Sequence, residues 1–257
     1  MKNYNFEFDL TYRCNLSCKW CNRLCGTKFR KPDDMSLERF RQNVNIIEPY
    51  INSQSQVRIL GGEPTLHPQI FEILDVFAQV IRPKMRFAIY ICTNEVGEKV
   101  VDTLNQIRAR YTTYTTYNGP EPNPQKRLSS SKQFCIVSKN NPVSGFHTFE
   151  EHKSIYKAAQ DYLPNKEDYS KNCRVLSECG YGINPYGIFI CSPAQYIATI
   201  YKLKGGLDHF PSLEEESEQK KLYCRYCYVP YESQHISPSY EKALKNWDEQ
   251  PYLLPII

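Results

Sequence analysis

Hydrophobic and polar residues alternate with a period of two from Tyr4 to Leu10, which is the pattern of a half-buried β-strand. Short runs rich in β-branched and aromatic residues recur further along the chain, and both residue types favour strands. These patterns predict strands near residues 4–10, 57–60, 86–92, 111–117 and 133–138.

The segments between the predicted strands carry a helical period. Leu37, Phe40, Val44 and Ile47 recur every three or four residues, so one face of that segment is apolar. A capping box at residues 148–151 predicts the start of another helix. The pattern places helices near residues 35–48, 68–81, 97–109 and 148–163. Alternating strands and helices indicate an α/β fold with parallel strands and helices outside the sheet.

Three cysteines, Cys14, Cys18 and Cys21, follow the first predicted strand, with Trp20 before the last of them. Thiolates at such short spacings hold iron–sulfur clusters or zinc. A cubane [4Fe–4S] cluster has four irons that each need an outer ligand, so three thiolates leave one iron open for a substrate or cofactor. A structural zinc site or a set of buried cysteines is the alternative.

A glycine-rich turn ends the second predicted strand. Gly61 and Gly62 lack a Cβ atom, so the chain can turn tightly and its amides and carbonyls can approach a ligand. Pro64 fixes φ where the chain leaves the turn. In barrels of parallel strands, the loops after the carboxyl ends of the strands build the active site. The turn and the cysteine loop both occupy that position.

The third predicted strand leads into Thr93 and Asn94. Both residue types accept hydrogen bonds from unpaired helix N–H groups, so one interpretation is that they cap the next helix. They also stand at the edge of the sheet where a ligand would bind, and the two roles are compatible.

The cysteine loop, with an aromatic residue before its last cysteine, and Gly-Gly-Glu-Pro at residues 61–64 together resemble the radical S-adenosylmethionine (radical SAM) superfamily. The resemblance implies a partial (β/α)6 TIM-like barrel. It implies a [4Fe–4S] cluster on Cys14, Cys18 and Cys21, with SAM bound to the open iron.

The same resemblance implies which residues contact SAM. The element at the end of the second strand would hold the methionine amino group, and the end of the third strand would lie near the ribose. Many relatives carry glycine where this chain has Glu95. The implied cofactor-binding residues are Trp20, Gly61, Gly62, Glu63, Pro64, Thr93 and Asn94.

Five of the 11 cysteines lie in the last third of the chain, after the polar stretch at residues 164–168 that we interpret as a domain boundary. We therefore predict a barrel domain over residues 1–165 and a smaller domain over residues 166–257. Residues 184–191 predict a β-hairpin that turns at residues 185–187 and delivers Cys191 to a metal.

The spacing Cys173-x17-Cys191, then a long gap, then Cys224-x2-Cys227 resembles the twitch domain, a shortened relative of the SPASM domain. The resemblance implies that these four thiolates hold an auxiliary [4Fe–4S] cluster. A zinc ribbon is the alternative, because four thiolates alone do not distinguish tetrahedral zinc from a cubane. Four cysteines have no assigned role: Cys25, Cys92, Cys135 and Cys179.

Composition fits a globular protein of 257 residues, with 41% hydrophobic residues and a net charge of +4. No block of lysine and arginine indicates nucleic acid, no apolar stretch approaches the length of a membrane span, and the N-terminus does not read as a signal peptide. We expect a cytoplasmic protein that acts on a small molecule, with no nucleic-acid or membrane partner.

By resemblance, the chain is an enzyme that cleaves SAM reductively to a 5′-deoxyadenosyl radical, which takes hydrogen from the substrate. The electron would come from a donor such as flavodoxin or ferredoxin. An auxiliary cluster saturated by four thiolates would accept an electron, so we expect a two-electron oxidation of a sugar or cyclitol-like metabolite. Length and tail are similar to the dehydrogenases that oxidise an aminocyclitol alcohol in aminoglycoside biosynthesis.

Two alternatives remain from the residues alone. One is a radical SAM epimerase or peptide-modifying maturase, and peptide-modifying relatives usually carry a longer tail with more cysteines. The other is a non-catalytic iron–sulfur or zinc protein, which would have no need for the turn at residues 61–64. The sequence identifies no catalytic acid or base.

Overall fold

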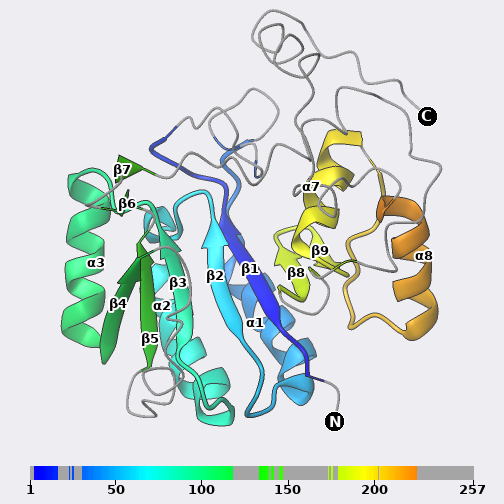
Figure 1. Cartoon of the computed structure of the whole chain (residues 1–257), viewed down its shortest axis with the longest axis horizontal. Helices are drawn as coiled ribbons and strands as arrows, with labels where there is room; N and C mark the ends of the chain where they lie inside the picture. The colour runs from blue at the N-terminus through cyan, green and yellow to red at the C-terminus, as the bar shows by residue number, and fades with distance from the viewer. Residues whose placement is uncertain are drawn as a thin grey trace, which may run out of the picture.

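The computed structural model describes residues 3–16, 23, 25, 31–117, 133–138, 140–141, 145–146, 173, 175, 179–201 and 203–224. Within these ranges the chain is a mixed α/β fold built on one seven-stranded, mostly parallel sheet (Figure 1). The strands of this sheet are β1 (Phe6–Thr11), β2 (Val57–Gly61), β3 (Ile89–Thr93), β4 (Thr113–Tyr117), β5 (Phe134–Ser138), β8 (Tyr181–Asn184) and β9 (Gly187–Phe189). A separate two-stranded sheet consists of β6 (Asn140–Asn141) and β7 (Gly145–Phe146).

Five α-helices and four shorter helical segments accompany the sheet in the described part of the chain. The α-helices are α1 (Leu37–Ile47), α2 (Ile70–Val76), α3 (Glu98–Arg110), α7 (Ser192–Tyr201) and α8 (Leu213–Tyr223). The shorter segments are η1 (Glu48–Tyr50), η2 (Pro64–Leu66), the π-helix η3 (Phe77–Ile81) and η4 (Arg82–Lys84).

The strands lie in the order β4-β5-β3-β2-β1-β8-β9. All neighbours pair in parallel except β8 and β9, which form an antiparallel hairpin. The predicted α/β fold with parallel strands is confirmed, and the sheet is consistent with a partial TIM-like barrel. Two features depart from simple chain order: β5 lies between β3 and β4, and β8 lies beside β1.

All five predicted strands form, with small shifts at their ends, and so do three of the four predicted helices. The predicted helix over 68–81 starts as α2 and continues as the π-helix η3. The fourth predicted helix, near residues 148–163, lies outside the described residues.

Strand β1 is buried on both faces, and the prediction that it is half-buried is wrong. Its aromatic face meets the helices behind the sheet in Figure 1: the ring of Phe8 lies 5.8 Å from that of Phe40 in α1 and 5.1 Å from that of Phe77. Successive side chains of a strand point to opposite faces. Asp9 therefore faces away from this core, and α7 covers it there.

The hairpin of β8 and β9 belongs to the main sheet, although it follows the predicted domain boundary. Strand β8 pairs in parallel with β1, with Phe6 opposite Tyr181 and Phe8 opposite Ile183. The division of the chain at residues 165–166 stays a prediction. None of the helices in the described ranges has the length and apolar character needed to cross a membrane.

His67, just after η2, is buried and links the segment before α1 to the segment before α2. Its Nε2 atom lies 2.9 Å from the carbonyl oxygen of Met35, and its Nδ1 atom accepts a hydrogen bond of 3.0 Å from the amide of Gln69. A carbonyl only accepts, so Nε2 carries the proton and the ring is neutral. Burial lowers the pKa of His67 below its ordinary value.

This histidine predicts a loss of stability in acid. The unfolded chain binds a proton near pH 6.5, whereas folded His67 resists it, so the free energy of unfolding should fall as pH drops below about 6.5. We expect His67→Gln to lower stability at neutral pH and to flatten this decline, measured by urea unfolding at a series of pH values.

His209→Gln is the control. His209 is half exposed, and its hydrogen bonds to the carboxylates of Asp208 and Glu215 raise its pKa. Its removal should instead reduce stability on the acidic side, because a raised pKa contributes stability that is lost as pH rises. A decline in His67→Gln as steep as in the wild type would contradict the prediction.

Candidate cluster and cofactor site

The carboxyl ends of β1, β2 and β3 meet at one edge of the sheet, the upper edge in Figure 1. Three of the sequence elements singled out above follow these ends and come together there: Cys14 after β1, the turn at residues 61–64 after β2, and Asn94 after β3. Trp20, Cys18 and Cys21 lie outside the described residues, as does Cys227.

The two glycines pack backbone against backbone on the start of the cysteine loop. A Cβ atom on Gly61, whose φ is 130°, would lie 2.2 Å from the carbonyl oxygen of Thr11. A Cβ atom on Gly62 would lie 2.2 Å from the carbonyl oxygen of Arg13. Both distances are far inside van der Waals contact, so only glycine fits at either position.

Hydrogen bonds reinforce this contact. The amide of Gly62 donates to the carbonyl of Thr11 at 2.7 Å, and the amide of Glu63 donates to the carbonyl of Arg13 at 2.8 Å. The sequence analysis expected these glycines to allow a ligand to approach. The structure adds a second reason for glycine here, which is that the turn packs directly on the backbone of the chain leading into Cys14.

Glu63 is fully buried, and its carboxylate ties the end of β2 to the end of β3. It accepts hydrogen bonds from the amide and hydroxyl of Thr65 at 3.2 and 2.7 Å, from the hydroxyl of Thr93 at 3.0 Å and from the amide of Asn94 at 2.7 Å. Burial raises the pKa of Glu63, while these four donors act in the opposite direction. The role of Glu63 toward SAM stays a prediction, and the structure gives it a clamping role as well.

Asn94 links the third strand to the cysteine loop. Its side-chain nitrogen donates to the side-chain oxygen of Asn15 at 2.8 Å and lies 3.9 Å from the sulfur of Cys14. Asn15 in turn donates to the carbonyl of Val96 at 2.6 Å. Hydrogen bonds to cluster sulfurs are one of the features that set a reduction potential. Asn94 is therefore placed to act on the first ligand of the predicted cluster.

The interpretation of Thr93 and Asn94 as helix caps is wrong. The N-cap of α3 is Gly97, and no side chain in the described part of the chain caps that helix. Glu95 adopts a φ of 55°, the left-handed region that favours glycine. The Glu95 carboxylate pairs with Arg108 at 2.9 Å.

Asp34 is a site residue that sequence reasoning missed. Its carboxylate accepts a hydrogen bond of 2.6 Å from the hydroxyl of Thr11 and forms an ion pair with Arg13, whose Nε atom lies 2.8 Å from Oδ2. The Thr11 hydroxyl also accepts the amide of Arg13 at 2.9 Å. No motif marks Asp34, which is 20 residues beyond Cys14 and reaches the loop only through the fold.

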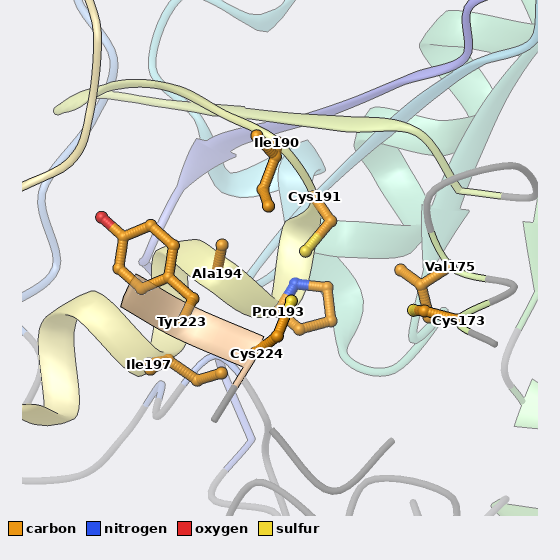
Figure 2. A pocket seen from close by; sticks show the side chains of 9 residues that line it. All are labelled: Cys173, Val175, Ile190, Cys191, Pro193, Ala194, Ile197, Tyr223 and Cys224. Atoms are coloured by element: carbon orange, nitrogen blue, oxygen red, sulfur yellow. The ribbon is translucent and has the colours of Figure 1, made fainter. Parts of the chain in front are cut away.

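A second group of cysteines lies in the tail. The predicted hairpin that leads into one of them, Cys191, is confirmed. Cys173, Cys191 and Cys224 line one pocket with six other residues, as Figure 2 shows. The rest of the lining is apolar except for Tyr223, whose hydroxyl points away from the thiols and donates to the carbonyl of Lys204 at 2.6 Å. The residues lining the pocket besides these cysteines and Tyr223 are Val175, Ile190, Pro193, Ala194 and Ile197.

The chemistry of this pocket fits a soft metal or cluster, since thiolates prefer zinc and iron–sulfur centres. Three of the four predicted ligands face it from separate segments of the chain. Among the described residues, no three potential ligands converge closely enough to hold a single metal ion. The fourth predicted ligand, Cys227, lies outside the described residues.

The cysteines without an assigned role differ in burial. Cys25 and Cys135 are buried, and Cys135 packs with Ala88, Tyr90 and Val137 on the face of the sheet away from α1 and α2. Buried cysteine behaves as a small apolar residue. Cys92 and Cys179 are partly exposed.

Comparison with known proteins gives a family match over most of the barrel. A sequence model described as the Radical SAM superfamily matches residues 8–166. A 74-residue segment is 34% identical to the Probable GTP 3',8-cyclase of Pyrococcus horikoshii, covering 27% of this chain and 21% of that protein. A 69-residue segment is 39% identical to the Mycofactocin maturase MftC of Mycobacterium tuberculosis, covering 26% of this chain and 16% of that protein. The matches thus span only about a fifth of these curated relatives.

Among solved structures, the chain is similar to BtrN in complex with AdoMet and 2-DOIA, with 14% identity, a TM-score of 0.45 and coverage of 91% of this chain and 87% of that one. It is also similar to BtrN in an open conformation, with 14% identity, a TM-score of 0.44 and 88% of both chains covered.

The Glu63 clamp yields a stability prediction. Glutamine has the shape of glutamate, but its amide nitrogen is a donor, so it would face the donors that the carboxylate now accepts. Leaving a buried polar group unsatisfied costs about 1–3 kcal/mol. We expect Glu63→Gln to lower the free energy of unfolding by about 1–3 kcal/mol in urea titrations.

Glu218→Gln, on an exposed face of α8, is the matched control and should change stability by less than about 0.5 kcal/mol. Equal stability of the two variants would show that the Glu63 clamp contributes nothing to the fold.

Proposed function

The chain belongs to the radical SAM superfamily, and from that premise we propose that it oxidises a small polar metabolite, such as a sugar or cyclitol, by two electrons. The family implies a [4Fe–4S] cluster and SAM. The observation that carries the proposal is the presence of thiols at two places: Cys14, at the carboxyl ends of the strands, and the tail pocket of Cys173, Cys191 and Cys224.

Cys14, Cys18 and Cys21 would hold the first cluster. Cys14 supports this role, because it is partly exposed at the edge of the sheet and its sulfur lies beside the side-chain nitrogen of Asn94. When bound, the cluster and SAM supply a 5′-deoxyadenosyl radical that takes a hydrogen atom from the substrate.

The protein's own contribution is to hold the reacting groups in place. The turn at residues 61–64 would receive the methionine end of SAM, and Thr93 and Asn94 would lie near the ribose. Glu63 supports this arrangement, because its buried carboxylate fixes the ends of β2 and β3 relative to each other. A site fixed in this way needs little reorganisation when the cofactor binds.

Cys173, Cys191, Cys224 and Cys227 would hold an auxiliary [4Fe–4S] cluster. With four thiolates no iron remains open for substrate, and the chemistry such a group supplies is electron acceptance. Oxidation of an alcohol to a ketone removes one hydrogen atom, one electron and one proton from the substrate. The radical generated at the first site would take the hydrogen atom, the auxiliary cluster would take the electron, and the proton would leave to water.

A second candidate function is modification of a peptide, because a 69-residue segment is 39% identical to the mycofactocin maturase. The two candidates differ in the substrate that transfers deuterium into 5′-deoxyadenosine: a labelled sugar or cyclitol for the first, and a labelled precursor peptide for the second.

The first cluster predicts reductive cleavage of SAM. Anaerobically reconstituted protein with dithionite should form 5′-deoxyadenosine, measured by liquid chromatography. Replacing Cys14, Cys18 and Cys21 together with alanine should abolish it, because no thiolate remains to hold the cluster. Cys135→Ala, which changes a buried cysteine of β5 outside both predicted ligand sets, is the control and should retain it. Product formation at the wild-type rate in the triple variant would refute the cluster assignment.

The tail site predicts a separate effect on iron and on product. The wild type should hold about eight irons per chain, and Cys191→Ala/Cys224→Ala should hold about four, because each cubane contains four irons. The double variant should still cleave SAM but lose the oxidised product, since its electron acceptor is gone. A wild-type preparation with about four irons and one zinc would support the zinc-ribbon alternative instead.

A further inference from the structure

A buried ion pair lies on the face of β1 that points away from α1 and α2. Asp9 is fully buried, Arg23 is 9% exposed, and the Nε atom of Arg23 lies 3.1 Å from Oδ1 of Asp9. Asp9 stands five residues before Cys14, and Arg23 stands two residues after Cys21. The pair therefore connects the strand that enters the predicted cluster loop to the segment that leaves it.

The other partners of this pair come from α7, in the tail. The side-chain nitrogen of Gln195 donates to Oδ2 of Asp9 at 2.7 Å, and the hydroxyl of Tyr196 donates to the same oxygen at 3.0 Å. The guanidinium carbon of Arg23 lies 5.1 Å from the centre of the Tyr196 ring, which is a cation–π distance. All four side chains are buried.

Helix α7 starts directly after Cys191, one of the predicted auxiliary ligands. Its first residue, Ser192, donates a hydrogen bond to the buried Glu7 of β1, and Glu7 also lies 3.6 Å from Arg58 of β2. Two successive turns of α7 thus hold two acidic residues of β1. The tail is joined to the cluster edge by polar contacts in the interior.

In such a network each member depends on the others for its stability. Moving one carboxylate and one guanidinium out of water is costly, and it is offset only when close pairing and further hydrogen bonds satisfy both groups. Removing one member leaves the other charge buried without compensation. The loop, β1 and α7 must therefore dock together, and loosening any one of them loosens the others.

We propose that Asp9, Arg23 and Tyr196 are positioning residues that couple α7 to the N-terminal cysteine loop, so that the tail helps to hold the loop around the first cluster. This inference rests on the proposed function only in that the loop carries a cluster. It adds that the first cluster depends on Tyr196, a residue of the tail that binds Asp9 and Arg23 rather than any predicted cluster ligand.

The test uses the reconstituted holoenzyme and follows the clusters themselves. Reduced protein is examined by electron paramagnetic resonance with and without SAM, and the signal that changes on SAM addition reports the first cluster. An iron chelator is then added, and the loss of that signal is timed. We expect Arg23→Met to lose it at least about tenfold faster than the wild type, because the buried charge of Asp9 then has no cationic partner in the network.

Tyr196→Phe is the milder variant, since it keeps the ring and removes only the hydroxyl bound to Asp9. It should accelerate loss of the SAM-responsive signal by several-fold and leave the remaining cluster signal unchanged. Arg23→Met/Asp9→Asn removes both charges and should restore part of the retention lost in Arg23→Met, because coupled residues are non-additive. If Arg23→Met does not fold, these two variants decide the question.

Arg110→Met is the matched control, since Arg110 of α3 pairs with Asp75 in a half-exposed ion pair that involves neither β1 nor α7. It should behave like the wild type. If the wild type shows no SAM-responsive signal, the proposed function fails. If the wild type shows one and both Arg23→Met and Tyr196→Phe retain it as the control does, the proposed function stands and the coupling is refuted.

Discussion

The burial of β1 on both faces is the constraint on which the rest of the structure depends. A parallel strand in the middle of a sheet has neighbours on both edges and layers on both faces, so each of its side chains needs a partner. Phe6, Phe8 and Leu10 meet the apolar core, while Glu7 and Asp9 meet polar groups. The strand ends three residues before Cys14, so the cysteine loop begins directly after a strand that is buried on both faces.

Close backbone contact fixes the end of β2 against the chain that follows β1. Gly61 and Gly62 bring the end of β2 onto Thr11 and Arg13, where a Cβ atom would not fit. The carboxylate of Glu63 then joins β2 to β3 through Thr93 and Asn94. Three strand ends and the start of the cysteine loop thereby form one connected unit. A radical enzyme needs such order, because its chemistry depends on placing one C–H bond of the substrate.

The tail contacts β1 in two ways, along its edge and on the face that points away from α1 and α2. Strand β8 extends the sheet beside β1, and α7 covers the acidic side chains of β1. The pocket lined by Cys173, Cys191 and Cys224 lies at the start of the same helix. Among the described residues, Cys14 and the cysteines of this pocket therefore belong to one packed structure.

The sequence by itself determined much of the barrel side and the chemistry near it. Period-two and helical patterns predicted β1 to β5, α1 to α3 and the hairpin of β8 and β9, but not α7 or α8. The spacing of the N-terminal cysteines and the Gly-Gly-Glu-Pro turn identified the family, because ligand chemistry acts over short stretches of chain. Tertiary structure alone decided the order of β5 and β4, the approach of Asp34 to the cysteine loop, the clamp made by Glu63 and the burial of Asp9 with Arg23 and Tyr196. These features join residues far apart in the chain, up to 187 positions for Asp9 and Tyr196. Their contacts depend on how strands and helices pack in space, and no local pattern of residues records that packing.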